Sequence, residues 1–170
     1  DSTTDGVGAA ANSNRRWPDL LAERFADAGL PYSVVNTGIG ANLLLGQGGV
    51  AQRFDRDALS FAGVGTVIVL AGINDFGFPG VTRQPQNLPT ADKIIAGLRD
   101  LIARTHAKGV RIIGGTIMPY AGTTMAGYYS PEGDAQRKLV NTWIREGREF
   151  DGVIDFEAAV RDPKDPDRFA

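Results

Sequence analysis

Thr66-Val67-Ile68-Val69-Leu70 is the stretch that decides the fold, and it runs directly into Ala71-Gly72-Ile73-Asn74-Asp75. Five consecutive apolar or β-branched residues predict a strand that is buried on both faces, which is typical of a parallel sheet. Polar residues that follow such a strand lie at the carboxyl edge of the sheet, where parallel α/β proteins bind their ligands. Asn74 is therefore a candidate site residue.

Helix and strand patterns alternate along the rest of the chain. Strands are predicted for residues 32–36, 66–70, 110–113 and 153–156, and helices for residues 17–28, 52–59, 90–108 and 130–147. The residues expected to face the core from the two long helices are Ile94, Ile95, Leu98, Leu101, Ile102, Thr105, Leu139, Val140, Trp143 and Ile144. Strands separated by helices of this length predict an α/β fold with a parallel sheet and helices on both of its faces, a three-layer α/β/α sandwich.

Composition narrows the function classes. The chain has 170 residues, of which 42% are hydrophobic and 22% charged, as expected for one globular domain. A formal net charge of −2 with scattered basic residues gives no basic patch for nucleic acid. The absence of cysteine excludes disulfides, thiolate metal sites and cysteine nucleophiles. No apolar run approaches the roughly 18 residues of a membrane-spanning helix.

The chain opens on Asp1-Ser2-Thr3-Thr4-Asp5-Gly6, which alone is typical of a polar turn or a helix cap. Combined with Asn74 after a buried strand, it favours catalysis, because a serine at a sharp turn and an amide at a strand end can attack an ester carbonyl and hold the oxyanion. Asn74 also has a structural interpretation, since asparagine commonly bonds a loop backbone at such positions. His106 is the sole histidine and lies near the carboxyl end of a predicted helix, where a structural role is expected.

Other polar groups do not indicate a different site. The pair of glycines in Gly38-Ile39-Gly40 lacks the spacing of a dinucleotide or phosphate-binding loop. Asp1, Asp5 and Asp75 flank the serine and the asparagine, but no histidine accompanies them, so solvated turn carboxylates are favoured over a metal site. Asp155 is interpreted as an ordinary carboxylate at the end of a strand.

Three segments together, Asp1–Gly6, Val34–Asn42 and Ala71–Asp75, resemble the first three motifs of the GDSL/SGNH hydrolase family of esterases and acylhydrolases. In that family the motifs are Gly-Asp-Ser, a segment that supplies a backbone N–H, Gly-x-Asn-Asp, and a final Asp-x-x-His. The resemblance implies that Ser2 is the nucleophile and first oxyanion donor, that the turn at Gly40 and Ala41 donates a backbone N–H, and that Asn74 donates its side-chain amide. It also implies a flavodoxin-like parallel sheet of five strands, of which four are predicted here.

The sequence departs from the family pattern in three places. No glycine precedes Asp1, and no Asp-x-x-His occurs before Ala170. Residues 1–170 are therefore expected to form a single SGNH hydrolase domain that is incomplete at both ends, with the catalytic Asp and His outside it. Ala41 stands where the family has a glycine, and a positive φ there would strain an alanine by roughly 1 kcal/mol.

The expected function is that of a serine esterase that cleaves small or carbohydrate-borne esters through an acyl-enzyme, without metal or organic cofactor. A catalytically inactive SGNH-like binding or scaffold domain is the alternative. Residues 76–89 contain three prolines and two glycines and are expected to form an insertion that walls the site. Tyr120, Tyr128 and Tyr129 are expected to line the same rim, which suits sugars or aryl esters. A secreted location is favoured over a cytoplasmic one, and the oligomeric state stays open.

Overall fold

The computed structural model describes all of residues 1–170, which divide into two compact units. The first unit is Asp1–Asn42 and the second unit is Leu43–Ala170. Each is described by itself. No helix in either unit combines the length and the apolar character needed to cross a membrane.

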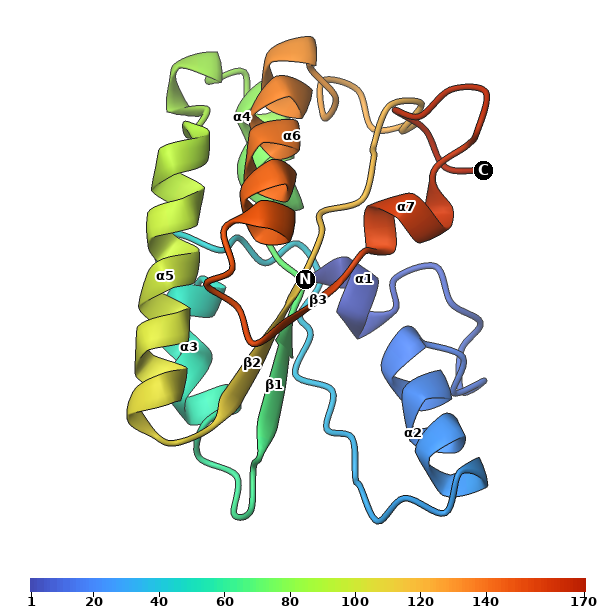
Figure 1. The fold of residues 1–170 in the computed structure, drawn as a ribbon. Helices are drawn as coiled ribbons and strands as arrows, with labels where there is room; N and C mark the ends of the chain where they lie inside the picture. The colour runs from blue at the N-terminus through green and yellow to red at the C-terminus, as the bar shows by residue number, and fades with distance from the viewer. The chain divides into compact units, whose positions relative to one another are not determined.

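The second unit is built on a parallel sheet of three strands in the order β1-β2-β3 (Figure 1). These strands are β1 (Thr66–Val69), β2 (Arg111–Gly115) and β3 (Gly152–Ile154). In the register of the sheet Val67 pairs with Ile112, and Gly114 pairs with Val153. The carboxyl ends of all three strands therefore meet at one edge. This confirms the predicted α/β fold with a parallel sheet.

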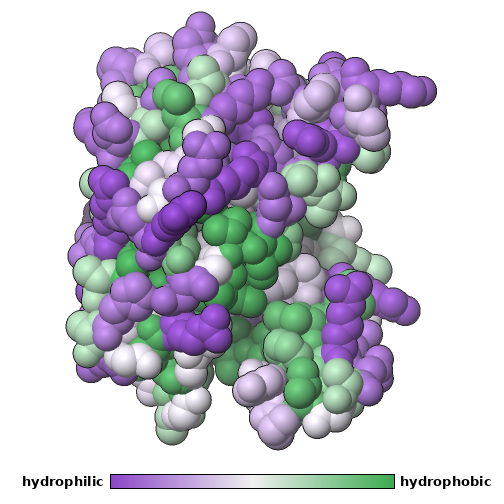
Figure 2. Space-filling model, in the orientation of Figure 1, coloured by the Kyte–Doolittle hydropathy of each residue, from purple (hydrophilic) through white to green (hydrophobic).

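Helices flank the sheet. They are α3 (Val50–Asp57), α4 (Ile73–Val81), the 3₁₀ helix η1 (Pro85–Asn87), α5 (Ala91–Ala107), α6 (Pro131–Glu146) and α7 (Phe156–Val160). α5 packs against β2, α3 and α6 (Figure 1). Figure 2 shows mostly hydrophilic residues over the helices at the left of the view. On the sheet, β3 carries the exposed Val153.

The predicted core face of α5 is confirmed. All six of its predicted inward residues are buried: Ile94, Ile95, Leu98, Leu101, Ile102 and Thr105. On α6, Val140 and Ile144 are buried as predicted and Trp143 packs against the core, but Leu139 is 56% exposed. The prediction for Leu139 is wrong because the buried face of α6 is partly polar, with Arg137 and Asn141 in positions expected for apolar residues.

The first unit contains α1 (Ser2–Asp5) and α2 (Trp17–Asp27) and no strand. The predicted strand at residues 32–36 is therefore wrong, and the sheet has three strands where four were expected. A strand forms only where its backbone pairs with a neighbour, and the first unit offers none. Tyr32 instead packs its ring edge-on against Phe25 of α2, with the ring centroids 5.3 Å apart.

The insertion at residues 76–89, for which no helix was predicted, is helical over its first half, because α4 continues to Val81 with Pro79 inside it. Phe76 is 1% exposed and α4 packs against α6. Burial of the Phe76 ring and the packing of α4 on α6 are tertiary contacts that favour the helix in spite of its glycines and proline, and local propensity does not contain them.

Candidate functional site

Ser2 lies at the first position of α1, directly after the residue that caps the helix. Asp1 caps it by accepting a hydrogen bond from the Thr3 N–H at 3.0 Å. Backbone N–H groups in the first turn of a helix have no partner within the helix. The Ser2 N–H makes no hydrogen bond within the first unit, so it is available to a ligand.

The segment that leads to Gly40 and Ala41 is tied to α1. The Asn36 side chain donates to the Thr4 carbonyl at 2.7 Å and accepts from the Gly38 N–H at 2.9 Å. Gly38 lies so close to α1 that a Cβ there would stand 2.3 Å from the Asp5 nitrogen, so only glycine fits. The structure thus brings Ser2 and the Gly40–Ala41 turn onto two joined segments of the first unit.

The two residues of this turn differ as hydrogen-bond donors. The Gly40 N–H donates to Asp5 Oδ2 at 2.9 Å and is therefore engaged. The Ala41 N–H makes no hydrogen bond within the first unit, which leaves it as the donor of the turn. Ala41 has φ +60, in the left-handed region that disfavours any residue with a Cβ.

Asn74 lies in the second unit, in the first turn of α4, at the carboxyl edge predicted from the sequence. Its side chain is buried, and its Oδ1 accepts a hydrogen bond from the Tyr128 hydroxyl at 2.6 Å. The cap residue Gly72 has φ +119, and a Cβ there would stand 2.9 Å from the Ile117 side chain. The turn that presents Asn74 therefore depends on glycine.

Asp75, the next residue, organises a neighbouring backbone segment. Its carboxylate accepts hydrogen bonds from the Leu44 N–H at 2.7 Å and the Leu45 N–H at 3.0 Å. Burial raises the pKa of Asp75, and these two donors oppose that rise. Asp75 is thus a buried structural carboxylate and not a solvated one.

The tyrosines expected at the rim have different environments. Tyr120 is 5% exposed and belongs to the core, with its ring edge-on to those of Tyr128 and Tyr129 at 5.8 and 5.2 Å. Burial raises the pKa of the Tyr128 hydroxyl above its ordinary value. Tyr128 therefore stays protonated and keeps a proton to donate to Asn74 at any working pH.

His106 is engaged far from Asn74. Its Nε2 lies 2.9 Å from Asp151 Oδ2, and the same oxygen accepts from the Ile112 N–H at 2.7 Å, at the start of β2. The Ile112 N–H and His106 together hold the pKa of Asp151 below its usual range. This pair lies at the amino-terminal edge of the sheet, opposite Asn74, which fits the structural role predicted for His106.

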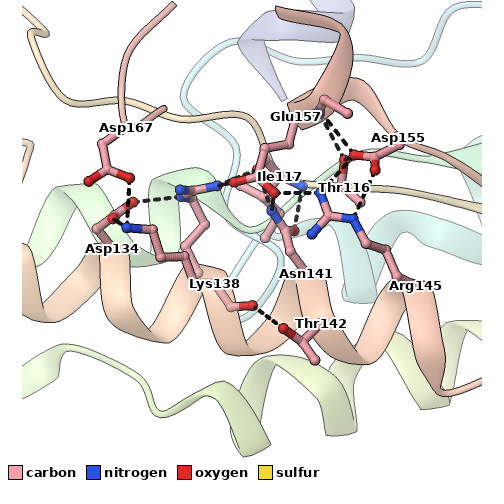
Figure 3. Close-up of polar contacts among 12 residues, drawn as sticks. Thr116, Ile117, Asp134, Lys138, Asn141, Thr142, Arg145, Asp155, Glu157 and Asp167 are labelled. Carbon is pink, nitrogen blue, oxygen red and sulfur yellow. Dashed lines mark hydrogen bonds and ion pairs between the residues drawn. The ribbon is translucent and has the colours of Figure 1, made fainter. Parts of the chain in front are cut away.

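A buried ion network joins the segments that follow β2 and β3 to α6 (Figure 3). Arg137 is fully buried, donates to Asp134 at 2.7 Å and to the Ile117 carbonyl at 2.9 Å, and pairs with Glu157. Asn141 donates to the Ile117 carbonyl at 2.7 Å and to Glu157 at 3.0 Å. The network fixes the backbone just beyond the carboxyl end of β2.

Arg145 extends this network to Asp155, for which the sequence suggested only an ordinary carboxylate. The Arg145 guanidinium holds the pKa of Asp155 well below its usual range, and Asp155 also accepts from Thr116 and caps α7. Burial acts to raise the pKa of Glu157, but Arg137 and Arg145 outweigh it and the net shift is downward.

Neither this network nor the contact of Tyr128 with Asn74 was predicted from the sequence. A signal for the network was present on α6, where polar residues recur at helical spacing: Asp134, Arg137, Asn141 and Arg145. A signal for a close neighbour of Asn74 was the three-residue spacing of Asn74, Gly77 and Gly80. This spacing places two glycines beside the asparagine on α4, where the ring of Tyr128 packs against Gly77.

Comparison with known proteins places this chain among hydrolases. Residues 1–169 match the model of the GDSL-like lipase/acylhydrolase family. The comparison with curated proteins gave no match.

Three solved structures share the fold. A putative lipolytic protein of the G-D-S-L family from Desulfitobacterium hafniense DCB-2 is 19% identical with a TM-score of 0.68, over 100% of this chain and 80% of that one. The psychrotrophic esterase EstA from Pseudoalteromonas sp., in a form inhibited by monoethylphosphonate, is 17% identical with a TM-score of 0.66, over 92% and 74%. A mutant of esterase AlinE4 is 17% identical with a TM-score of 0.65, over 96% and 77%.

Proposed function

The chain belongs to the GDSL-like lipase/acylhydrolase family, and from that premise we propose that it is a serine esterase that works through an acyl-enzyme with Ser2 as the nucleophile. Ser2 Oγ attacks the ester carbonyl carbon, and the carbonyl oxygen takes up the negative charge. The N–H groups of Ser2 and Ala41 and the Asn74 amide hold this oxyanion. A general base takes the Ser2 hydroxyl proton and gives it to the departing alcohol, and water then releases the acyl group as a carboxylic acid and restores the Ser2 hydroxyl. The chemistry needs no metal or organic cofactor.

The observation that carries the proposal is the pair of available donors in the first unit. Ser2 and Ala41 each present an N–H without a partner in that unit, on segments joined by the Asp5–Gly40 hydrogen bond. An oxyanion hole requires such donors to be fixed before the reaction, because preorganisation is what makes them effective. Gly40 serves in this arrangement by holding the turn against Asp5.

We do not propose any of residues 1–170 as the general base. His106 is engaged by Asp151 at the amino-terminal edge of the sheet, while Asn74 lies at the carboxyl edge. The family's base is the histidine of an Asp-x-x-His motif, and His106 has alanine three positions before it.

For the substrate we propose a small or carbohydrate-borne ester. Support comes from the aromatic surroundings of Asn74, where Tyr128 and Phe78 meet edge-on with their centroids 5.7 Å apart. Aromatic side chains favour contact with sugar rings and aryl groups.

A fluorophosphonate probe tests the nucleophile in the full-length protein. We expect one label per chain and none in Ser2→Ala, because the probe bonds covalently to an activated serine. The matched control is Ser13→Ala in the same unit, whose hydroxyl only donates to the Ala10 carbonyl at 2.7 Å, and it should label like the wild type.

Two results would count against the proposal. Labelling that survives Ser2→Ala would move the chemistry to another residue. A folded full-length protein that neither labels nor hydrolyses p-nitrophenyl acetate would favour the alternative, a binding or scaffold domain that retains the fold.

A further inference from the structure

We propose that Tyr128 is a positioning residue for the oxyanion hole: its hydroxyl holds the Asn74 side chain so that the amide N–H₂ is directed to the substrate oxygen. This rests on the proposed function, in which Asn74 is an oxyanion donor. Tyr128 comes from the segment between β2 and α6, 54 residues away in the chain, and no motif of the sequence analysis assigned it this role.

The hydrogen bond sets which end of the amide donates. The Tyr128 hydroxyl donates to Asn74 Oδ1 at 2.6 Å, a distance typical of a strong O–H···O bond. An amide whose oxygen is held in this way has its nitrogen fixed on the other branch, so the group cannot flip end for end. Donation to the oxygen also polarises the amide, which makes its N–H₂ group a better donor.

The ring of Tyr128 is held as firmly as its hydroxyl. It lies against Gly77, where a Cβ would stand 2.3–2.6 Å from three ring atoms. Phe78 and Tyr120 contact it edge-on, with the centroids 5.7 and 5.8 Å away. The ring therefore has one position, and that position depends on a glycine inside a helix.

A second glycine on the same face of α4 completes the docking surface. Gly80 lies so close to the next segment that a Cβ there would stand 2.1 Å from the Gly127 carbonyl oxygen. Asn74, Gly77 and Gly80 follow one another at three-residue spacing, so they share one face of the helix. Glycine costs a helix interior about 1 kcal/mol relative to alanine, so two of them on one face point to a packing requirement. That requirement is the close approach of Tyr128 and its neighbour to the asparagine.

The test is a double-mutant cycle in the full-length protein with p-nitrophenyl acetate. Asn74→Ala should lower kcat by roughly 10²–10³. Tyr128→Phe keeps the ring and its contacts, so the variant should fold, and it should lower kcat about tenfold with KM within about twofold. In the Asn74→Ala background, Tyr128→Phe should cause no further loss, because the hydroxyl acts only through the amide. Values of kcat are taken per active site titrated with fluorophosphonate, so partial unfolding does not imitate a loss of rate.

The matched control is Tyr120→Phe. Tyr120 belongs to the same aromatic cluster, but its hydroxyl reaches the Ser130 carbonyl at 3.5 Å and not Asn74. We expect its kcat to equal that of the wild type.

The outcomes separate the inference from its premise. If Asn74→Ala leaves kcat unchanged, Asn74 is not an oxyanion donor and the proposed function fails at this residue, along with the role of Tyr128. If Asn74→Ala has its expected effect but Tyr128→Phe lowers only the melting temperature, Tyr128 merely braces the loop and this inference alone is wrong. An equal loss from Tyr128→Phe in both backgrounds would also overturn it.

Discussion

The two units differ in what holds their site residues in place. In the second unit, the helix that carries Asn74 packs into a continuous hydrophobic core, and polar groups buried at its edge are paired with one another. In the first unit, the segments around Ser2 are joined by hydrogen bonds in which the Asn36 and Trp17 side chains donate and the Asp5 carboxylate accepts. Several apolar side chains of this unit, among them Val7 and Tyr32, are exposed.

This difference predicts which substitutions disturb the position of each group of donors in the proposed oxyanion hole. The stability gained from apolar burial is proportional to the buried area, so a packed segment keeps its position when one contact is lost. A segment that is held by a few hydrogen bonds loses its geometry when any one of them is removed. The placement of α4, which carries Asn74, should therefore withstand the loss of one apolar contact, and Ser2 should be sensitive to the few polar residues that tie α1 to the Gly40–Ala41 turn.

The largest expected effect lies in the second unit, at the buried ion network. Arg137→Met removes a guanidinium that is fully buried and leaves Asp134 and Glu157 as buried carboxylates with one partner fewer. We expect the free energy of unfolding to fall by about 3–5 kcal/mol, because an uncompensated buried charge is costly. Urea denaturation followed by circular dichroism measures this.

Lys138→Met on the same helix is the control. Lys138 pairs with Asp134 at 2.8 Å and Asp167 at 2.6 Å, but its side chain is 50% exposed. Its removal should cost no more than about 1 kcal/mol. Equal losses from the two variants would mean that burial does not distinguish the network from surface ion pairs.

An intermediate effect is expected in the first unit from Asn36→Ala. The substitution removes the bonds to the Thr4 carbonyl and the Gly38 N–H, and should lower the free energy of unfolding by about 1–2 kcal/mol. Trp17 and Trp143 are the two tryptophans, so in a Trp143→Phe background the fluorescence of Trp17 reports the first unit alone. We also expect slower fluorophosphonate labelling of Ser2, because α1 loses its tether to the turn.

Ser13→Ala, which removes an exposed hydrogen bond in the same unit, should stay within about 0.5 kcal/mol of the parent. A loss from Asn36→Ala no greater than that of Ser13→Ala, with unchanged labelling, would show that the first unit does not depend on its polar links.

The fold could be predicted from sequence wherever a periodic pattern was long enough to outweigh local exceptions. The apolar run of β1 and the six inward residues of α5 are such patterns. The strand and the buried helix face were both confirmed, but the predicted burial of the strand on both faces was wrong at Thr66, which is exposed, and Val67 and Ile68 are half-buried. The predicted strand at residues 32–36 was wrong because strand formation depends on a pairing partner that no local pattern reveals. The helical first half of the insertion at residues 76–89 was not predicted, because its glycines and Pro79 disfavour a helix locally and the burial of Phe76 that favours one is a tertiary contact.

For the candidate site, motif resemblance named Ser2, Gly40, Ala41 and Asn74, and these assignments stay predictions. What sequence reasoning could not supply were the contacts that position them, because these join residues far apart in the chain. The Asn36–Thr4 bond spans 32 residues and the Tyr128–Asn74 bond spans 54. A periodicity or a motif describes neighbours in sequence, so it carries no information on such pairs.

The smallest expected effect comes from Ala41→Gly and has the opposite sign. Ala41 has φ +60, where an alanine is strained and a glycine is not. We expect the substitution to raise the free energy of unfolding of the first unit by about 1 kcal/mol, less the entropy that glycine adds to the unfolded chain. Trp17 fluorescence in the Trp143→Phe background measures it.

Ala28→Gly separates this strain from a general effect of glycine. Ala28 ends α2 in the same unit with φ −81, a conformation that alanine adopts without strain, so only the entropy of the unfolded chain changes. That variant should lose about 0.4–1 kcal/mol while Ala41→Gly gains. Opposite signs for the same chemical change would show that the backbone at Ala41 is held in the left-handed region by its surroundings. Losses at both positions would mean that Ala41 relaxes to negative φ in solution, and the N–H proposed as an oxyanion donor would then point elsewhere.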